Sequence, residues 1–146
     1  MDYGRFFITT PIYYVNDNPH IGHAYTTLAA DVLARYWRKR GAEVFFLTGT
    51  DEHGSKIAQA AKKQNKSPKA FVDGVVVKYK AAWSVLDISY DNFIRTTDVH
   101  HEKFVSDFVQ KLYDNKEIYQ DKYHGLYCVG CEEYKDPDEL EKGKIC

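Results

Sequence analysis

The tetrapeptide His20-Ile21-Gly22-His23 places two imidazole rings where an extended segment gives way to a helical one. Backbone N–H groups at a helix start and the helix dipole both favour an anion. The first turn of this helix has no acidic residue, so we expect His20 and His23 to donate N–H groups to a phosphate. Gly22 would let a base or ribose approach the backbone. The alternative is that one histidine caps the helix and the other lies on the surface.

A second polar group, residues 49–54, follows another strand-like segment. The carboxylate of Asp51 in this group is suited to bind the α-ammonium group of an amino acid. Asp51 could equally be the N-cap of a helix that begins near residue 54. His53 has a similar ambiguity between a place at a ligand pocket and a purely structural place.

The three cysteines lie near the C-terminal end of the chain, where Cys128 and Cys131 form a Cys-x-x-Cys motif. The two-residue gap lets both thiolates bind one tetrahedral Zn²⁺, with Gly130 permitting a tight turn. Cys146 is the third expected ligand, and the next expected Cys or His would lie past it. His124 is a candidate for the fourth ligand only by proximity. The alternatives are a redox pair or unligated thiols. A structural zinc site is favoured because strand-like aromatic residues, and not a helix start, surround the motif.

The hydrophobic pattern predicts the elements that position these residues. The expected strands are residues 5–10, 43–48 and 93–96, with a strand-like segment over residues 118–128. The expected helices are residues 22–40 with Gly41 as a cap, a short helix through Ile57 and Ala61, residues 68–86 after the N-cap Ser67, and a helix that begins near Asp98.

The order strand, helix, strand forms a βαβ unit, which implies an α/β fold with a parallel sheet covered by helices. Ligands of such folds bind in a crevice at the carboxyl ends of the strands. Residues 11–23 and 49–54 both fall at those ends, so we expect the two polar groups to face one crevice. A composition change near residue 115 predicts two parts, 1–115 and 116–146, and the second holds all the cysteines.

The composition, with 44% hydrophobic and 28% charged residues, is that of an ordinary globular protein. A formal net charge of -1 gives no overall positive field that would attract nucleic acid. No run approaches the length of a membrane span, and the chain does not begin with a secretory leader. We therefore expect a cytoplasmic protein, which also suits an odd number of cysteines.

The signature at residues 20–23 resembles that of class I aminoacyl-tRNA synthetases. Three segments, residues 9–16, 48–54 and 127–132, further resemble the methionyl-tRNA synthetase family, in the family's order and spacing. The resemblance covers essentially the whole chain. It implies the first half of a Rossmann-like catalytic domain, followed by the start of a connective insertion with a zinc knuckle.

The resemblance also implies a reaction, in which methionine and ATP with Mg²⁺ form methionyl adenylate and pyrophosphate before transfer to tRNA(Met). His20 and His23 would be the catalytic pair at the ATP phosphates, with Gly22 at the nucleotide. Asp51 would bind the α-ammonium group of methionine, and His53 would help to line its pocket. No covalent enzyme intermediate is needed.

Pro11, Ile12 and Tyr14 would form one wall of the methionine site by the same resemblance. A thioether needs apolar, polarisable surroundings with aromatic contacts. Tyr13 and Tyr14 taken alone are interpreted more simply as aromatic residues of the core or its rim.

The family's second signature, Lys-Met-Ser-Lys-Ser, does not occur in the sequence, nor does the second half of the fold or an anticodon-binding domain. We therefore expect a fragment or one piece of a split enzyme, with little activity alone and its remainder downstream or in a separate chain. Another adenylyl-transferring family would not explain the three matching segments. The alternative from a different class is a catalytically silent nucleotide- or adenylate-binding module with the same fold.

Overall fold

The computed structural model describes residues 4–140 of the chain. The chain divides into two compact units, Met1–Val105 and Ser106–Cys146. Helix α4 (Val99–Asp114) begins in the first unit and ends in the second. Each unit is described below by itself.

The first unit contains a parallel sheet in which the long strand β3 (Glu43–Asp51) pairs with three others. Strand β1 (Arg5–Thr9) pairs with the first half of β3, and the two-residue strand β2 (Tyr13–Tyr14) pairs with its end. Strand β4 (Asn92–Arg95) pairs with residues 47–50. The parallel α/β fold predicted from the βαβ order is confirmed.

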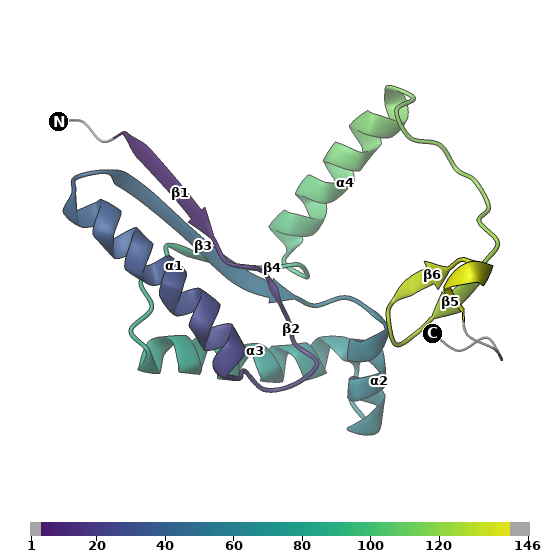
Figure 1. The fold of residues 1–146 in the computed structure, drawn as a ribbon, viewed down its shortest axis with the longest axis horizontal. Helices are drawn as coiled ribbons and strands as arrows, with labels where there is room; N and C mark the ends of the chain where they lie inside the picture. The colour runs from purple at the N-terminus through teal and green to yellow at the C-terminus, as the bar shows by residue number, and fades with distance from the viewer. Residues whose placement is uncertain (1–3, 141–146) are drawn as a thin grey trace. The chain divides into compact units, whose positions relative to one another are not determined.

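Three helices of the first unit contribute to two hydrophobic core clusters (Figure 1). Helix α1 (Ile21–Lys39) connects β2 to β3 and packs Ala30 and Ala34 against Phe46. Helices α2 (Ser55–Lys63) and α3 (Pro68–Val85) belong to a second cluster. Its buried residues are Tyr13, Val15, Ile57, Ala61, Phe71, Val72, Val75, Val76, Tyr79 and Trp83.

Local signals for helix ends act as the sequence predicts. The hydroxyl of Ser67 accepts the N–H of Ala70 at 3.2 Å, and Pro68 occupies the first turn of α3. Gly41 follows α1 with a φ of 89°, a left-handed conformation that costs glycine little. The boundaries of α1 and α3 therefore agree with the prediction to within one residue.

The end of β3 differs from the prediction, because residues 49–51 belong to the strand and not to a polar turn. Their backbone is held by β2 and by β4, and β2 itself was not predicted. Gly49 makes the approach of β4 possible, since a Cβ at this position would lie 2.1 Å from the carbonyl oxygen of Ile94. The pairing thus carries the strand into the segment that holds Asp51.

The second unit holds a small antiparallel hairpin, β5 (Leu126–Cys128) and β6 (Glu133–Lys135), followed by a 3-10 turn, Pro137–Glu139. The ring of Tyr134 packs edge-on against Tyr123 and Tyr127, with centroids 4.7 and 5.2 Å away. The expected strand over residues 118–128 is wrong except for its last three residues, because β6 offers a partner only to those. Within residues 4–140, no helix combines the length and apolar character that crossing a bilayer requires.

Candidate active site

The start of α1 is capped by its own histidines, which corrects the expectation of an open helix end. Nδ1 of His20 accepts the N–H of Gly22 at 3.1 Å, and Nδ1 of His23 accepts the N–H of His20 at 3.2 Å. An imidazole nitrogen can serve here as a carboxamide oxygen does at other caps. Capping the helix and donating to a phosphate are compatible roles. A neutral ring that accepts at Nδ1 carries its proton at Nε2 and keeps that N–H as a donor.

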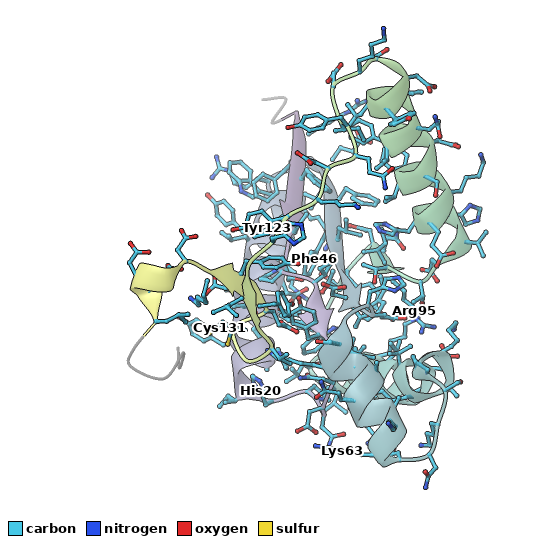
Figure 2. The ribbon with its side chains drawn as sticks, turned by 90° about the vertical axis from the view of Figure 1, so that its right-hand side faces the viewer. His20, Phe46, Lys63, Arg95, Tyr123 and Cys131 are labelled. Atoms are coloured by element: carbon cyan, nitrogen blue, oxygen red, sulfur yellow. The ribbon has the colours of Figure 1, made fainter. Side chains whose placement is uncertain are left out.

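Gly22 gives the ring of His20 room at this helix start. A Cβ on Gly22 would lie 3.0 Å from Cε1 and 3.1 Å from Nδ1 of His20, which is closer than side chains normally pack. The space that we assigned to a base or ribose is therefore occupied, at least in part, by imidazole. His20 is labelled in Figure 2.

His23 lies half-buried among aromatic rings. Its ring centroid is 4.8 Å from that of Tyr13 and 5.3 Å from that of Tyr79. Burial, and next to it the proximity of His20, hold the pKa of His23 below its ordinary value of 6.5. The fold therefore favours the neutral ring of His23, which still offers an N–H donor.

Tyr79 supports both His23 and the backbone of β2. Its hydroxyl lies 3.3 Å from Nδ1 of His23 and 3.3 Å from the carbonyl oxygen of Tyr14. Burial, with smaller contributions from Tyr13 and Asp17, raises the pKa of Tyr79 to about 12. The phenol therefore keeps its proton at neutral pH.

Strand β2 connects the helix start to the end of β3. The hydroxyl of Tyr13 lies 2.7 Å from Oγ1 of Thr26 and 2.8 Å from Oγ1 of Thr27, both on α1. The next residue, Tyr14, is in register with Asp51. The histidines and Asp51 therefore lie at the same end of the sheet, as the βαβ order predicts.

A cavity of about 460 Å³ opens beside the histidines. It is lined by Ile12, Tyr13, Tyr14, Asn16, Asp17, Asn18, His20, His23, Lys56 and Tyr79. The cavity therefore brings together four of the residues singled out in the sequence, Ile12, Tyr14, His20 and His23. Pro11, Gly22, Asp51 and His53 are not among its lining residues. The two tyrosines differ in burial, since Tyr13 belongs to the core whereas Tyr14 is exposed.

Lys56 and Tyr79 were not recognised as candidates from the sequence. Tyr79 was counted only as one apolar position of a predicted helix, because periodicity does not show which end of a face reaches a cavity. Lys56 follows the second polar group by two residues, and that proximity was the only available signal.

Asp51 and His53 converge on Thr96, the residue that follows β4. The hydroxyl of Thr96 lies 3.5 Å from Oδ1 of Asp51, and its carbonyl oxygen lies 3.3 Å from Nε2 of His53. Asp51 is half-buried and His53 is exposed. The N-cap of α2 is Gly54, with no hydrogen bond from a capping side chain, so the alternative in which Asp51 caps this helix is wrong.

Between these two residues, the carboxylate of Glu52 is buried in a network that was not predicted. Arg95, labelled in Figure 2, donates to it from Nε at 2.6 Å and from Nη2 at 2.7 Å. The hydroxyls of Thr50 and Thr97 also donate to it. Burial by itself raises the pKa of Glu52, but the hydrogen bonds from Arg95, Thr50 and Thr97 outweigh it and hold the pKa below its ordinary value of 4.5.

The cysteine motif lies at the turn between β5 and β6 (Figure 2, Cys131). The N–H of Cys131 points to Sγ of Cys128 at 3.4 Å, and the left-handed residue of the turn is Glu132, with a φ of 61°, and not Gly130. Among the described residues, no group of three or more His, Cys, Asp or Glu side chains is placed to hold a metal ion. Cys146 lies outside the described residues.

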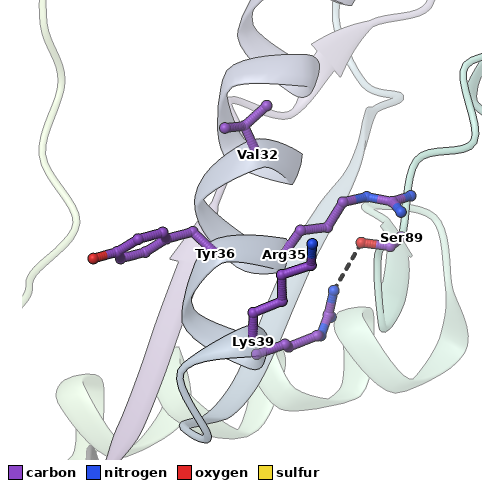
Figure 3. A pocket seen from close by; sticks show the side chains of 6 residues that line it. Val32, Arg35, Tyr36, Lys39 and Ser89 are labelled. Atoms are coloured by element: carbon purple, nitrogen blue, oxygen red, sulfur yellow. Dashed lines mark hydrogen bonds between the residues drawn. The ribbon is translucent and has the colours of Figure 1, made fainter.

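A larger cavity, of about 570 Å³, lies on α1 and is lined by none of the residues singled out in the sequence (Figure 3). Two arginines at its wall are engaged by acidic residues, Arg35 with Asp31 at 2.6 Å and Arg38 with Asp91 at 2.7 Å. Arg38 also donates to the hydroxyl of Ser89 at 2.7 Å. Since these cations are already paired, the smaller cavity beside the histidines is the better candidate site.

Comparison with known proteins finds relatives that match almost the whole chain. A methionine–tRNA ligase of Streptomyces coelicolor is 55% identical over 140 residues, which cover 95% of this chain and 26% of the relative. One from Thermotoga maritima is 54% identical over 138 residues, 94% of this chain and 22% of the relative. The chain thus spans about a quarter of the length of these relatives.

Solved structures give the same result. Mycobacterium tuberculosis methionyl-tRNA synthetase in complex with methionyl-adenylate superimposes with a TM-score of 0.89 and 38% identity, over 97% of this chain and 27% of that one. The family model for tRNA synthetases class I (M) matches residues 6–145. By this match the chain belongs to the family of tRNA synthetases class I (M).

Proposed function

We propose that this chain is the N-terminal portion of a methionine–tRNA ligase, which activates methionine with ATP and transfers it to tRNA(Met). The names of the relatives support the substrate, since they are methionine–tRNA ligases at 54–55% identity. The register of Tyr14 with Asp51 carries the proposal, because it brings a carboxylate to the sheet end where the imidazole donors lie.

The activation step needs stabilisation of charge and no covalent enzyme intermediate. A carboxylate oxygen of methionine attacks the α-phosphorus of ATP, and the bond to the bridging oxygen breaks as pyrophosphate leaves with the electron pair. Negative charge on the phosphate oxygens is met by Nε2–H donors of His20 and His23. The rings suit this task because their orientation is already set by the hydrogen bonds that they accept at Nδ1. Mg²⁺, which accompanies ATP, supplies charge neutralisation on the phosphates.

The amino-acid side of the site follows from the chemistry of methionine. The carboxylate of Asp51 binds the α-ammonium group, and the exposed ring of His53 lies beside it on Thr96. Pro11, Ile12 and Tyr14 form an apolar wall for the thioether. Ile12 and Tyr14 support this role, because both line the cavity that also holds the histidines.

We further infer that residues 1–115 are the first half of the catalytic domain and that residues 116–146 begin an insertion. In that insertion, Cys128, Cys131 and Cys146 would hold a structural Zn²⁺, with a fourth ligand beyond them. The turn that carries two of these thiols supports this proposal, and a reducing cytoplasm is the compartment that suits them. The metal takes no part in the reaction.

Titration calorimetry of the chain with a non-hydrolysable methionyl-adenylate analogue tests the proposal. We expect binding that is weakened by His23→Ala and by Asp51→Asn, while His100→Ala, a change at an exposed histidine on α4, leaves it unchanged. A chain that binds the analogue equally well in all three variants would exclude the proposed site. Binding of analogue without methionine-dependent pyrophosphate exchange by the full-length protein would identify a catalytically silent module instead.

A further inference from the structure

The Glu52 carboxylate is fully used inside the fold. Its side chain has a relative exposure of 0%, and its oxygens accept two N–H groups of Arg95 and the hydroxyl of Thr50. The hydroxyl of Thr97 makes a further hydrogen bond to it. A carboxylate with this many donors can neither reach a substrate nor exchange a proton at neutral pH, so its function is exerted through its neighbours.

The Arg95 guanidinium ties three elements together at this point. Arg95 belongs to β4 and donates to Glu52, the residue that follows β3. It also donates from Nη2 to Oδ1 of Asp73 on α3 at 2.6 Å. The fork of an arginine can bond both oxygens of one carboxylate and still reach a second, which a lysine ammonium cannot do with the same geometry. The pair therefore fixes the position of β4 relative to the last residues of β3.

Thr96 connects the ion pair to Asp51 and His53. It lies between Arg95 and Thr97, which both hold Glu52, and its own hydroxyl accepts the N–H of Glu52 at 2.8 Å. The same hydroxyl is the partner of Asp51 at 3.5 Å, and the carbonyl oxygen of Thr96 is the partner of His53. One residue thus contacts three consecutive residues of the segment.

Successive side chains of an extended segment point to opposite faces. Glu52 is buried, and if the segment stays extended past the end of β3 this alternation predicts that Asp51 and His53 point to the other face. We propose that the buried Glu52–Arg95 ion pair, acting through Thr96, positions Asp51 and His53 to receive the α-ammonium end of the amino-acid substrate. Glu52 and Arg95 are positioning residues, and this inference rests on the function proposed above.

The test uses the full-length protein that carries residues 1–146 and the methionine-dependent pyrophosphate exchange reaction. Glu52→Gln should raise the KM for methionine about ten-fold or more, whereas the KM for ATP should change less than about two-fold. A merely structural loss would impair both substrates. Glu43→Gln, which removes an exposed ion pair with Arg5 at the other end of the same strand, is the matched control and should change neither KM.

A double-mutant cycle separates action through Asp51 from a separate effect. If Glu52 works through Asp51, the rise in the KM for methionine in the combined Glu52→Gln and Asp51→Asn variant should be little larger than that of Asp51→Asn alone. If the rise in the KM for methionine in the combined variant equals the product of the rises in the two single variants, the inference is overturned. So would an equal rise in the KM for ATP.

Thr96→Val provides a second route if Glu52→Gln does not fold. It keeps the shape of the side chain and the buried ion pair but removes the hydroxyl between Glu52 and Asp51. It should also raise the KM for methionine selectively, and an unchanged KM would contradict the inference. Wild-type protein without methionine-dependent exchange would instead refute the proposed function itself, which is a different outcome from an active enzyme with unselective variants.

Discussion

The imidazole rings of His20 and His23 stack with their centroids 3.7 Å apart and their planes inclined by 23°. Each ring turns Nδ1 toward a backbone N–H of the helix start. Each ring therefore keeps Nε2 as an N–H donor. A phosphate can be bound here by directional hydrogen bonds and by the dipole of α1 together.

Substitution of His20 should separate capping from nucleotide chemistry. His20→Ala should lower the free energy of unfolding by about 1 kcal/mol, because the cap of α1 is lost. His20→Asn should keep most of that stability, since its side-chain oxygen can accept the N–H of Gly22. Both variants should slow adenylate formation by the full-length protein about 100-fold. Urea unfolding and pyrophosphate exchange measure the two effects, and a fully active asparagine variant would show that His20 only caps the helix.

The lowered pKa of His23 predicts a loss of stability in mild acid. The folded chain binds a proton at His23 less readily than the unfolded chain, whose pKa is near the ordinary value of 6.5. The stabilisation of the neutral ring is therefore complete above that pH and is lost as the pH falls toward the folded pKa. Urea unfolding between about pH 8 and about pH 5 measures this effect. The free energy of unfolding of the wild-type protein should exceed that of His23→Gln by an amount that decreases as the pH falls. Equal pH slopes for the wild-type protein and His23→Gln would contradict the prediction.

The close contact at Gly49 predicts opposite effects of one methyl group at two glycines. Gly49→Ala should lower the free energy of unfolding by about 3 kcal/mol, because its Cβ would overlap the backbone of Ile94. Gly74→Ala, in the middle of α3 with nothing within 4 Å of the added Cβ, should raise it by about 0.5 to 1 kcal/mol. Chemical denaturation of both variants measures the difference. A neutral Gly49→Ala would mean that β4 can move away from β3 at little cost.

The proposed zinc site predicts a metal content that depends on the cysteine motif. The full-length protein, purified without chelator, should contain one Zn²⁺ that is lost in Cys128→Ser and in Cys131→Ser. His124→Ala should keep the metal, since this histidine is a neighbour in sequence and not an expected ligand. Elemental analysis provides the measurement, together with the exchange rate as a check that the active site is intact. A wild-type protein that contains no zinc would contradict the proposed zinc site.

Local patterns were sufficient to predict most of the fold. Helical periodicity and the signals at Ser67 and Gly41 located α1 and α3, because these signals act within a few residues of the element that they end. Strand β2 could not be found in this way, since Tyr13 and Tyr14 are held as a strand only by pairing with a distant part of the chain. Gly49 was predicted to lie in a turn for the same reason, because its place in β3 depends on pairing with the distant strand β4.

Individual residues of the candidate site were harder to assign than the elements that carry them. Residue types and spacing made His20 and His23 candidates, but did not show that the two rings would cap the helix start themselves. Glu52 was passed over because its function depends on Arg95, a residue that only the packing of β4 brings near. Hydrophobic periodicity predicts which apolar positions are buried, but it does not predict that a charged residue such as Glu52 is buried with a distant partner.

At Thr50 the chain has a strand on each side, because this residue is in register both with Tyr13 of β2 and with Arg95 of β4. The backbone that leads into Asp51 is therefore immobilised before any amino acid arrives. A recognition group on a fraying strand end would have to be ordered at the moment of binding, at an entropic cost. Here that ordering has already taken place during folding. If Asp51 has the role proposed for it, more of its attraction for the α-ammonium group remains as affinity.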